Sequence, residues 1–234
     1  MRAVTSLDGA SILVAGASGG LGAPLSRLLA ERGANLTLVG RSTDRLAAVG
    51  VRSAAAFAVD LSDAGGPQAC VEAAVAQWGR LDGVVHVAGV VAFGSAVEVD
   101  DATLDLLVRT NLLAPIRLLR AAYPHLHVSA VEGRAPFVLN VSAVVAEQPM
   151  AGMAAYTATK AGLAAFDAAA GRELRRARIR LVDARPPHTE TGLATRPVAG
   201  RAPTLPQGKD PKDVAARLLA AIVADERDLP SSSF

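Results

Sequence analysis

The chain has 234 residues, of which 51% are hydrophobic and 20% charged, and its formal net charge is +2. This composition suits one compact domain with a buried core, and the small net charge excludes a general attraction to nucleic acid or to an anionic membrane. Cys70 is the only cysteine, so an internal disulfide and a multi-cysteine metal site are also excluded. No apolar run reaches the roughly 18 residues that a membrane helix needs, and residues 1–10 contain no signal core, so we expect a cytoplasmic protein.

Apolar runs alternate with helical patterns from Ser11 onward, without an internal repeat or a linker. This alternation is typical of a parallel sheet covered by helices, so residues 1–234 are predicted to form one α/β domain: a doubly wound parallel sheet of six or seven strands with helices on both faces. The predicted strands are Ser11–Ala15, Asn35–Val39, Ala54–Val59, Gly83–Val87, Phe137–Val141 and Ile179–Asp183. The predicted helices are Leu21–Arg32, Thr43–Ala48, Gly66–Trp78, Asp101–His125, Ala151–Ala177 and Pro211–Ala224.

A glycine-rich turn connects the first predicted strand to the first predicted helix. Glycines allow a tight turn there and let a pyrophosphate approach the backbone N–H groups at a helix N-terminus. The strand–turn–helix context, rather than the glycines alone, predicts a Rossmann-type dinucleotide site, although the spacing is G-x-x-x-G-x-G. The residues assigned to this site are Gly16, Ser18, Gly19, Gly20, Leu21 and Gly22.

The end of the second strand bears on the choice of cofactor. An acidic residue at this point would bind the adenosine ribose of NAD, but Gly40 has no carboxylate. Arg41 can instead pair with a 2′-phosphate, and Ser42 can add a hydroxyl. A solvated loop arginine is the alternative interpretation of Arg41. We therefore expect NADP(H) to be favoured over NAD(H).

Further candidates follow the third and fourth strands. Asp60 and Leu61 could reach the adenine, or Asp60 could only cap the next helix. His86 is either an interior histidine or a contact at the cofactor edge, and it has no partner at metal-ligand spacing, so no metal is expected. Ala88 and Gly89 are small enough for a flat ring to lie close to the backbone.

A proline is expected to bend the long predicted helix beside an asparagine. Pro115 frees a carbonyl near residue 111 and bends the axis there. Asn111 could hold a water at that bend, or its side chain could be satisfied by the backbone.

A tyrosine and a lysine lie four residues apart in another predicted helix. Because this spacing places both on one helix face, the Lys160 ammonium can lower the pKa of the Tyr156 phenol from its usual value of about 10. The pair is therefore a candidate proton donor and acceptor. Ser142 ends the fifth strand, at the edge of the sheet where α/β proteins bind ligands, and Arg185 to Thr191 follow the sixth strand at the same edge.

These features, in this order, resemble the short-chain dehydrogenase/reductase family over nearly the whole chain. The resemblance implies that Tyr156 is the general acid in carbonyl reduction, that Ser142 hydrogen-bonds the substrate oxygen, and that Lys160 binds the nicotinamide ribose and lowers the pKa of Tyr156. It also implies that Asn111 holds a water that relays protons. The residues that carry the resemblance are Gly16, Gly20, Gly22, Asp60, Ala88, Gly89, Asn111, Ser142, Tyr156, Lys160 and the segment from Pro186 through Thr189 to Thr191.

The chain departs from the family pattern at several positions. His86 replaces the usual Asn, and Pro187 stands where a Gly is usual, which removes a backbone donor near the nicotinamide carboxamide. Thr189 or Thr191 could still contact the carboxamide or the pyrophosphate. The C-terminus is short, so a final strand could be missing or truncated.

The substrate pocket is predicted to be mainly apolar, with residues 189–210 as a lid. Arg196, Arg201 and Lys209 in this segment could attract an acidic or phosphopantetheine-bearing substrate, or could simply be exposed loop bases. The residues assigned to the substrate are Ser142, Val144, Met150, Tyr156 and Leu193.

The resulting functional prediction is an NADP(H)-dependent oxidoreductase that interconverts a small-molecule carbonyl and a secondary alcohol. A 3-oxoacyl-thioester reductase and a non-catalytic NADP(H)-binding regulator are the alternatives. Five arginines between Arg172 and Arg180 suit a helix C-terminus rather than nucleic acid, because no aromatic residues interleave them. Family resemblance implies a homodimer or homotetramer.

Overall fold

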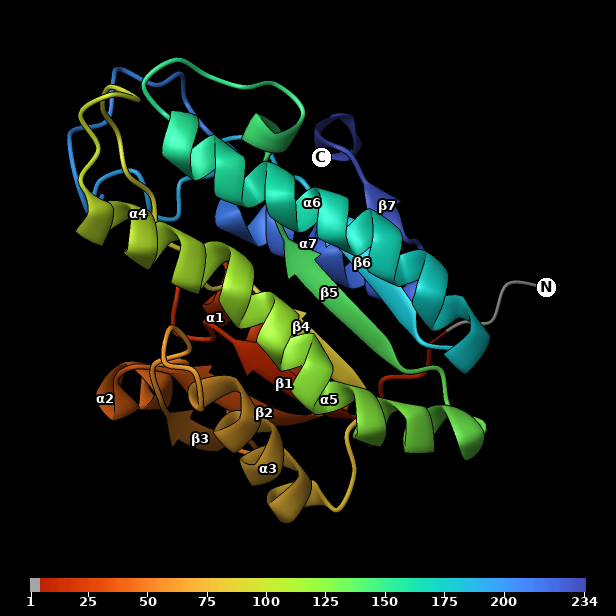
Figure 1. Ribbon diagram of the computed structural model, residues 1–234. Helices are drawn as coiled ribbons and strands as arrows, with labels where there is room; N and C mark the ends of the chain where they lie inside the picture. Colours follow the sequence, from red (N-terminus) through yellow and green to blue (C-terminus); the bar gives the residue numbers. More distant parts are fainter. Residues whose placement is uncertain (1–4) are drawn as a thin grey trace.

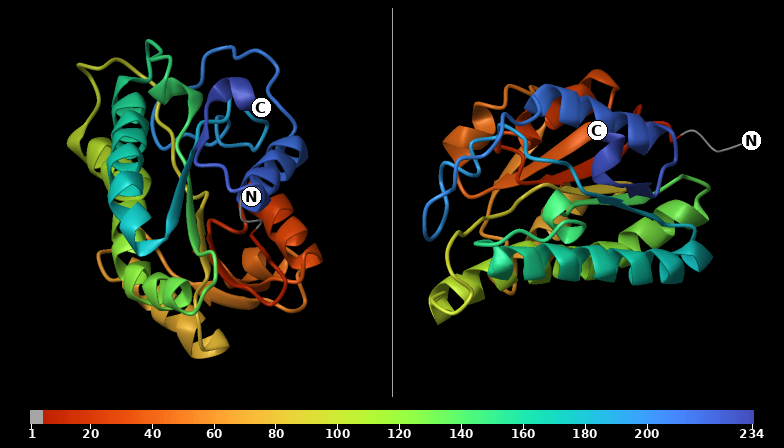
Figure 2. Two further views of the ribbon diagram at one scale, coloured as in Figure 1. Left: turned by 90° about the vertical axis from the view of Figure 1, so that its right-hand side faces the viewer. Right: turned by 90° about the horizontal axis from the view of Figure 1, so that it is seen from above.

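The computed structural model describes residues 5–234, so residues 1–4 of the predicted domain lie outside the described part. Seven parallel strands form one sheet in the order β3-β2-β1-β4-β5-β6-β7, and helices cover both of its faces (Figures 1 and 2). This confirms the predicted doubly wound α/β fold. The strands are β1 Ser11–Ala15, β2 Asn35–Gly40, β3 Ala55–Ala58, β4 Gly83–His86, β5 Phe137–Val141, β6 Arg180–Ala184 and β7 Asp228–Leu229. The α-helices are α1 Gly22–Glu31, α2 Thr43–Ala47, α3 Gly66–Trp78, α4 Asp101–Val108, α5 Ala114–Val131, α6 Ala154–Leu174 and α7 Pro211–Val223.

The final strand is present but only two residues long. Asp228 pairs with Asp183 and Leu229 with Ala184, both in parallel register with β6. The buried Leu229 explains why so short a strand persists, since its side chain joins the core beneath α7. The sheet therefore has seven strands, and its last strand is truncated rather than missing.

The helix predicted over Asp101–His125 is interrupted. A π-helical turn, Arg109–Leu113, separates α4 from α5. Pro115 lies at the start of α5 and has no N–H to donate to the carbonyl four residues earlier, which belongs to Asn111. The proline therefore disturbs the hydrogen-bond ladder at the predicted place, and the disturbance takes the form of a wide turn that contains Asn111.

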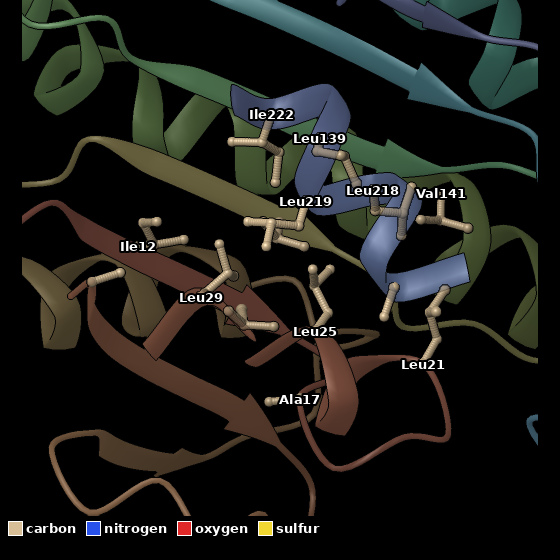
Figure 3. Packing of buried hydrophobic residues seen from close by; sticks show 14 of the residues in the cluster. Ile12, Ala17, Leu21, Leu25, Leu29, Leu139, Val141, Leu218, Leu219 and Ile222 are labelled. Carbon is tan, nitrogen blue, oxygen red and sulfur yellow. The ribbon is translucent and has the colours of Figure 1, made fainter. Parts of the chain in front are cut away.

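Two apolar layers hold the helices to the sheet. On one face α1 and α7 pack together over the sheet, and Figure 3 shows Leu25 and Leu29 of α1 opposite Leu218 and Ile222 of α7. On the other face α3, α5 and α6 cover a second cluster of buried residues. Burial of a leucine of this kind is worth about 2 kcal/mol, so both helix layers are fixed firmly relative to the strand ends.

Arg180 differs from the other arginines of its cluster. Only 4% of it is exposed, and its guanidinium donates to the carbonyls of Ala221 and Ile222 at 3.1 and 2.6 Å while pairing with Asp225 at 3.0 Å. Arg180 therefore does serve a helix C-terminus, as expected, but that of α7 rather than that of the helix that precedes it in the chain. It fastens the end of α7 to β6, whereas Arg172, Arg175, Arg176 and Arg178 are exposed.

Within residues 5–234, no helix has the length and apolar character that crossing a bilayer requires.

Candidate active site

A cavity of about 500 Å³ lies where the carboxyl ends of the parallel strands meet α6 and the segment after β6. Most of the residues selected from the sequence line it. Gly22, His86 and Asn111 do not. Those that do are Gly16, Ser18, Gly19, Gly20, Leu21, Arg41, Ser42, Asp60, Leu61, Ala88, Gly89, Ser142, Val144, Met150, Tyr156, Lys160, Pro186, Thr189, Thr191 and Leu193.

The glycine-rich turn is shaped by close backbone approaches. Gly16 has φ +86°, and a Cβ on it would lie 2.6 Å from the backbone nitrogen of Ala88. A Cβ on Gly20 would lie 2.5 Å from the carbonyl oxygen of Thr191. Gly22 faces the turn rather than the cavity, since a Cβ there would lie 2.1 Å from the Gly16 carbonyl oxygen. The first two glycines therefore let the backbone at Ala88 and Thr191 approach the turn closely, and the third allows the turn to pack against the helix.

Two arginines stand at the end of the cavity beside β2. Arg41 lines it, and Ser42 caps α2 by accepting a hydrogen bond from the backbone N–H of Arg45 at 3.4 Å. The Arg45 guanidinium donates to the carbonyl of Ser18 in the glycine turn at 3.2 Å, and Arg45 also lines the cavity. Sequence reasoning missed Arg45, although its place in the first turn of a helix capped by Ser42 was a usable signal.

Tyr156 and Lys160 share one face of α6 as predicted, and both line the cavity. The Lys160 ammonium lies 6.0 Å from the centre of the Tyr156 ring, and only 6% of Tyr156 is exposed. Burial raises the pKa of the Tyr156 phenol above its usual value, so the expected lowering of this pKa by Lys160 is wrong for the protein without a ligand. The phenol therefore stays protonated, which is the state that a proton donor requires.

Lys160 is 3% exposed, and its ammonium donates to the carbonyl of Val141 at 2.9 Å. Burial lowers the pKa of Lys160 to about 8, while the carboxylates of Asp183 and Asp167 oppose that change. A Cβ on Gly89 would lie 3.2 Å from the Asn111 side-chain oxygen and 3.5 Å from the Lys160 nitrogen. The ammonium thus lies directly beside Gly89, beyond the end of β4.

The Asn111 side chain is satisfied by its surroundings. Its oxygen accepts from the N–H of Val90 at 2.9 Å, and its nitrogen donates to the carbonyl of Val90 at 2.8 Å and to the hydroxyl of Thr159 at 3.2 Å. Asn111 is fully buried. Of the two interpretations, the geometry favours an asparagine that fixes the segment after β4, and it does not support a side chain that holds a water in the cavity.

The Ser142 hydroxyl points to a buried carboxylate. It donates to Asp183 at 2.5 Å and lies 3.3 Å from the carbonyl of Ala184, and only 2% of Ser142 is exposed. The neighbouring residue, Ala143, is the one that packs against the apolar cluster containing Tyr156. This geometry does not support the predicted hydrogen bond from Ser142 to a substrate oxygen.

The structure also bears on the alternatives that the sequence left open for His86 and Asp60. His86 is completely buried and does not line the cavity, so the interior alternative holds and the contact with the cofactor edge does not. Burial lowers the pKa of His86 to about 3, with the nearby Lys160 adding to the effect, so its ring is neutral. Asp60 accepts from the N–H of Ser62 at 2.9 Å and so closes the turn after β3, but it does not cap α3, whose N-cap is Gly65; it also lines the cavity.

The predicted lid segment closes one side of the cavity. Its backbone is bridged to the segment after β4, where the N–H of Phe93 donates to Ala199 at 3.0 Å and that of Val198 to Val91 at 2.8 Å. The walls near Tyr156 are apolar. They include Val91, Phe93, Val144, Val145, Met150, Met153, Leu193, Val198 and Leu205.

The comparison with protein families agrees with the site. The family model described as short chain dehydrogenase matches residues 10–201, which is most of the chain and includes the glycine turn, Tyr156 and Lys160. The chain belongs to the short-chain dehydrogenase/reductase family. Its fold and family are thus those of an NAD(P)(H)-dependent oxidoreductase.

Individual members of the family resemble this short-chain dehydrogenase/reductase over most of their length. An uncharacterized oxidoreductase of Methylorubrum extorquens is 32% identical over 84% of the chain and 80% of its own length. A 3-ketoacyl-(acyl-carrier-protein) reductase of Brucella melitensis, solved with NADH, is 27% identical with a TM-score of 0.85, covering 97% of this chain and 99% of its own. A metagenomic short-chain oxidoreductase solved with NADP is 32% identical with a TM-score of 0.77, covering 94% and 93%.

The site of this family member fits such a cofactor by its own geometry. The glycine turn offers backbone N–H groups at a helix N-terminus, and Lys160 offers an ammonium beside Gly89, where a side chain would fill the space. Among the described residues, no group of three His, Cys, Asp or Glu side chains is placed to hold a metal ion.

Proposed function

We propose that the protein is an NADP(H)-dependent reductase that converts a ketone or aldehyde of mainly apolar character to an alcohol. The observation that carries this proposal is the single cavity that unites the glycine turn with the buried Tyr156–Lys160 pair. The bound cofactor supplies the hydride. The protein supplies the binding site, the orientation and the proton.

In this proposal Tyr156 donates its phenolic proton to the substrate oxygen. Burial raises the pKa of the phenol, so it carries its proton at neutral pH and can give that proton to the oxygen as the hydride arrives. Lys160 binds the ribose hydroxyls of the cofactor beside Gly89 and places a positive charge near the oxygen that the proton leaves. Asn111 fixes the segment after β4, and Ser142, which lines the cavity, donates its hydroxyl hydrogen to Asp183.

The cavity supports a small apolar substrate better than an acyl-carrier thioester. Of the three bases in the lid, only Arg196 lines the cavity, and its guanidinium donates to the backbone carbonyl of Gly192 at 2.9 Å. Arg201 and Lys209 do not line it. A panel of apolar ketones, aldehydes and 3-oxoacyl thioesters, assayed with NADPH and with NADH, tests the proposal. Reduction of the ketones or aldehydes with NADPH is expected, and no consumption of either cofactor with any of the compounds would contradict it.

Arg41 and Arg45 are expected to decide between NADPH and NADH. Each guanidinium can make a charge-assisted hydrogen bond to the 2′-phosphate, and such a bond is worth about 1.5–3 kcal/mol. Arg41→Ala and Arg45→Ala should therefore each raise the KM for NADPH roughly 10- to 100-fold while leaving the KM for NADH nearly unchanged. Steady-state kinetics with both cofactors measures this.

A matched control is Arg32→Ala, which removes an exposed arginine beyond the end of α1 that does not line the cavity. It should leave both KM values as they are. A native preference for NADH, or an equal loss with both cofactors in Arg41→Ala, would refute the assignment of a 2′-phosphate site.

A further inference from the structure

A row of buried polar side chains crosses the sheet beneath the Tyr–Lys pair. His86 of β4 pairs in register with Asn140 of β5, and Asn140 pairs with Asp183 of β6. Residues paired in this way project from the same face of a parallel sheet. Ser142 lies two residues beyond Asn140 and therefore on that face as well. All four are buried, and of the four only Ser142 lines the cavity.

Asp183 is the charged centre of this row. One of its oxygens accepts the Ser142 hydroxyl at 2.5 Å, and the other pairs with the guanidinium of Arg185. Arg185 is held in turn by Glu147 at 2.5 Å and by Asp228 at 2.5 Å, both nearer the surface. Burial raises the pKa of Asp183, whereas Ser142 and Arg185 oppose that effect. The ion pair keeps this buried carboxylate ionised near neutral pH.

The positively charged Lys160 ammonium, unlike the Asp183 carboxylate, has no direct ion-pair partner among the described residues. It donates to a backbone carbonyl, and within residues 5–234 it makes no ion pair with a carboxylate. The titratable groups that face it are Tyr156, His86, Asp167 and Asp183. The tyrosine and the histidine are neutral, so only the two aspartates can offset the cost of burying the ammonium.

The two aspartates are not equivalent. Burial raises the pKa of Asp167 to about 8, with Asn140 donating to one of its oxygens at 2.7 Å. Its other oxygen has no hydrogen-bond partner among the described residues, so no hydrogen bond stabilises the ionised form on that side. Asp183, which has an arginine and a hydroxyl on its two oxygens, is therefore the main source of negative charge.

We propose that Asp183, fixed by Ser142 and Arg185, is a positioning residue that keeps the Lys160 ammonium protonated at the working pH. The inference rests on the proposed function, because it matters only if the charged lysine acts on the cofactor and on Tyr156. It also gives the Ser142 hydroxyl a role, because the hydroxyl orients and stabilises the carboxylate beneath the site.

The chain allows a direct test, because Lys160, Lys209 and Lys212 are its only lysines. With ¹³Cε-labelled lysine, NMR resolves three side chains, two of which are exposed and serve as internal references. Lys160 should titrate near pH 8 in the unmodified protein. Asp183→Asn keeps an acceptor for Ser142 but removes the charge, and it should lower the Lys160 midpoint by about one pH unit.

Asp228→Asn is the matched control. It makes the same chemical change at the neighbouring position of the sheet and on the same Arg185, but its side chain is 67% exposed. The Lys160 midpoint should be unchanged in this variant. If Asp183→Asn does not fold, Asp183→Ser removes the charge without placing an amide against the Arg185 guanidinium. An unchanged Lys160 midpoint in the folded variant would overturn the proposal.

A second readout separates this inference from the proposed function. In reductase assays the rate should fall on the alkaline side as Lys160 loses its proton, and in Asp183→Asn that fall should begin about one pH unit lower, with little change at acidic pH. A general structural defect would lower the rate at every pH, and that result would contradict the inference. If no carbonyl is reduced, the proposed function fails while the NMR titration still tests the link between Asp183 and Lys160.

Discussion

Replacing Tyr156 with phenylalanine is expected to reduce turnover about a thousandfold, because the substrate oxygen then has no positioned proton donor. No other side chain takes over this role, since the Ser142 hydroxyl donates to Asp183 and the neighbouring Ala143 is apolar. The ring of phenylalanine still fills the place of the phenol in the apolar cluster. NADPH binding should therefore survive, and a fluorescence titration of NADPH alongside the loss of its absorbance on turnover measures both effects.

The chain contains one other tyrosine, which provides the control. Tyr123 lies on α5, is 41% exposed and stacks on His127, outside the cavity. Tyr123→Phe should retain the full rate. Turnover of Tyr156→Phe at the rate of the unmodified protein would refute the proton-donor role, whereas loss of folding would show up as loss of NADPH binding.

Replacing Lys160 with methionine is expected to lower kcat/KM about a hundredfold or more. The ammonium is proposed both to bind the cofactor ribose and to place positive charge near Tyr156, and a single hydrogen bond from a charged group is worth about 1.5–3 kcal/mol. Methionine has a similar length and suits a buried position, so the fold should persist. Both a higher KM for NADPH and a lower kcat are expected from steady-state kinetics.

Lys160→Arg should not restore the activity. The planar guanidinium is larger than the ammonium, and position 160 is only 3% exposed, so its neighbours would have to move to accommodate an arginine. Lys212→Met changes an exposed lysine at the start of α7 and should have no effect on either constant. Full activity of Lys160→Met would rule out a catalytic ammonium.

Much of the fold could be predicted because its signals are local. The first strand runs directly into glycines that the backbone geometry requires, and β1 and β5 have the predicted bounds. The ends of α6 were placed too far out, because Gly152 adopts φ +77° and three residues of 3₁₀ helix follow Leu174. The interruption between α4 and α5 was predicted only as a bend, because a proline alone does not determine whether a helix kinks or forms a wide π-helical turn.

The site was harder to predict where a residue's role depends on the direction of its side chain rather than on its position in the fold. Ser142 lies at the expected strand end, but its hydroxyl faces Asp183, a residue from a different strand that the sequence had not connected with it. The expected direction of the Tyr156 pKa shift was wrong because burial raises this pKa, and burial depends on the packing of distant segments. Arg180 and Arg178 likewise look alike in sequence, yet only the former turns inward.

The most direct test of the proposed reaction follows the hydrogen that NADPH transfers from its C4 to the carbonyl carbon. NADPH deuterated at one face or the other of C4 is offered with a ketone that the protein reduces, and the alcohol is analysed by mass spectrometry and NMR. The account predicts that one of the two labelled cofactors transfers a single deuterium to the carbinol carbon, while the hydroxyl hydrogen comes from the solvent. Product without deuterium on that carbon from either labelled cofactor would contradict hydride transfer in the cavity of Tyr156 and Lys160.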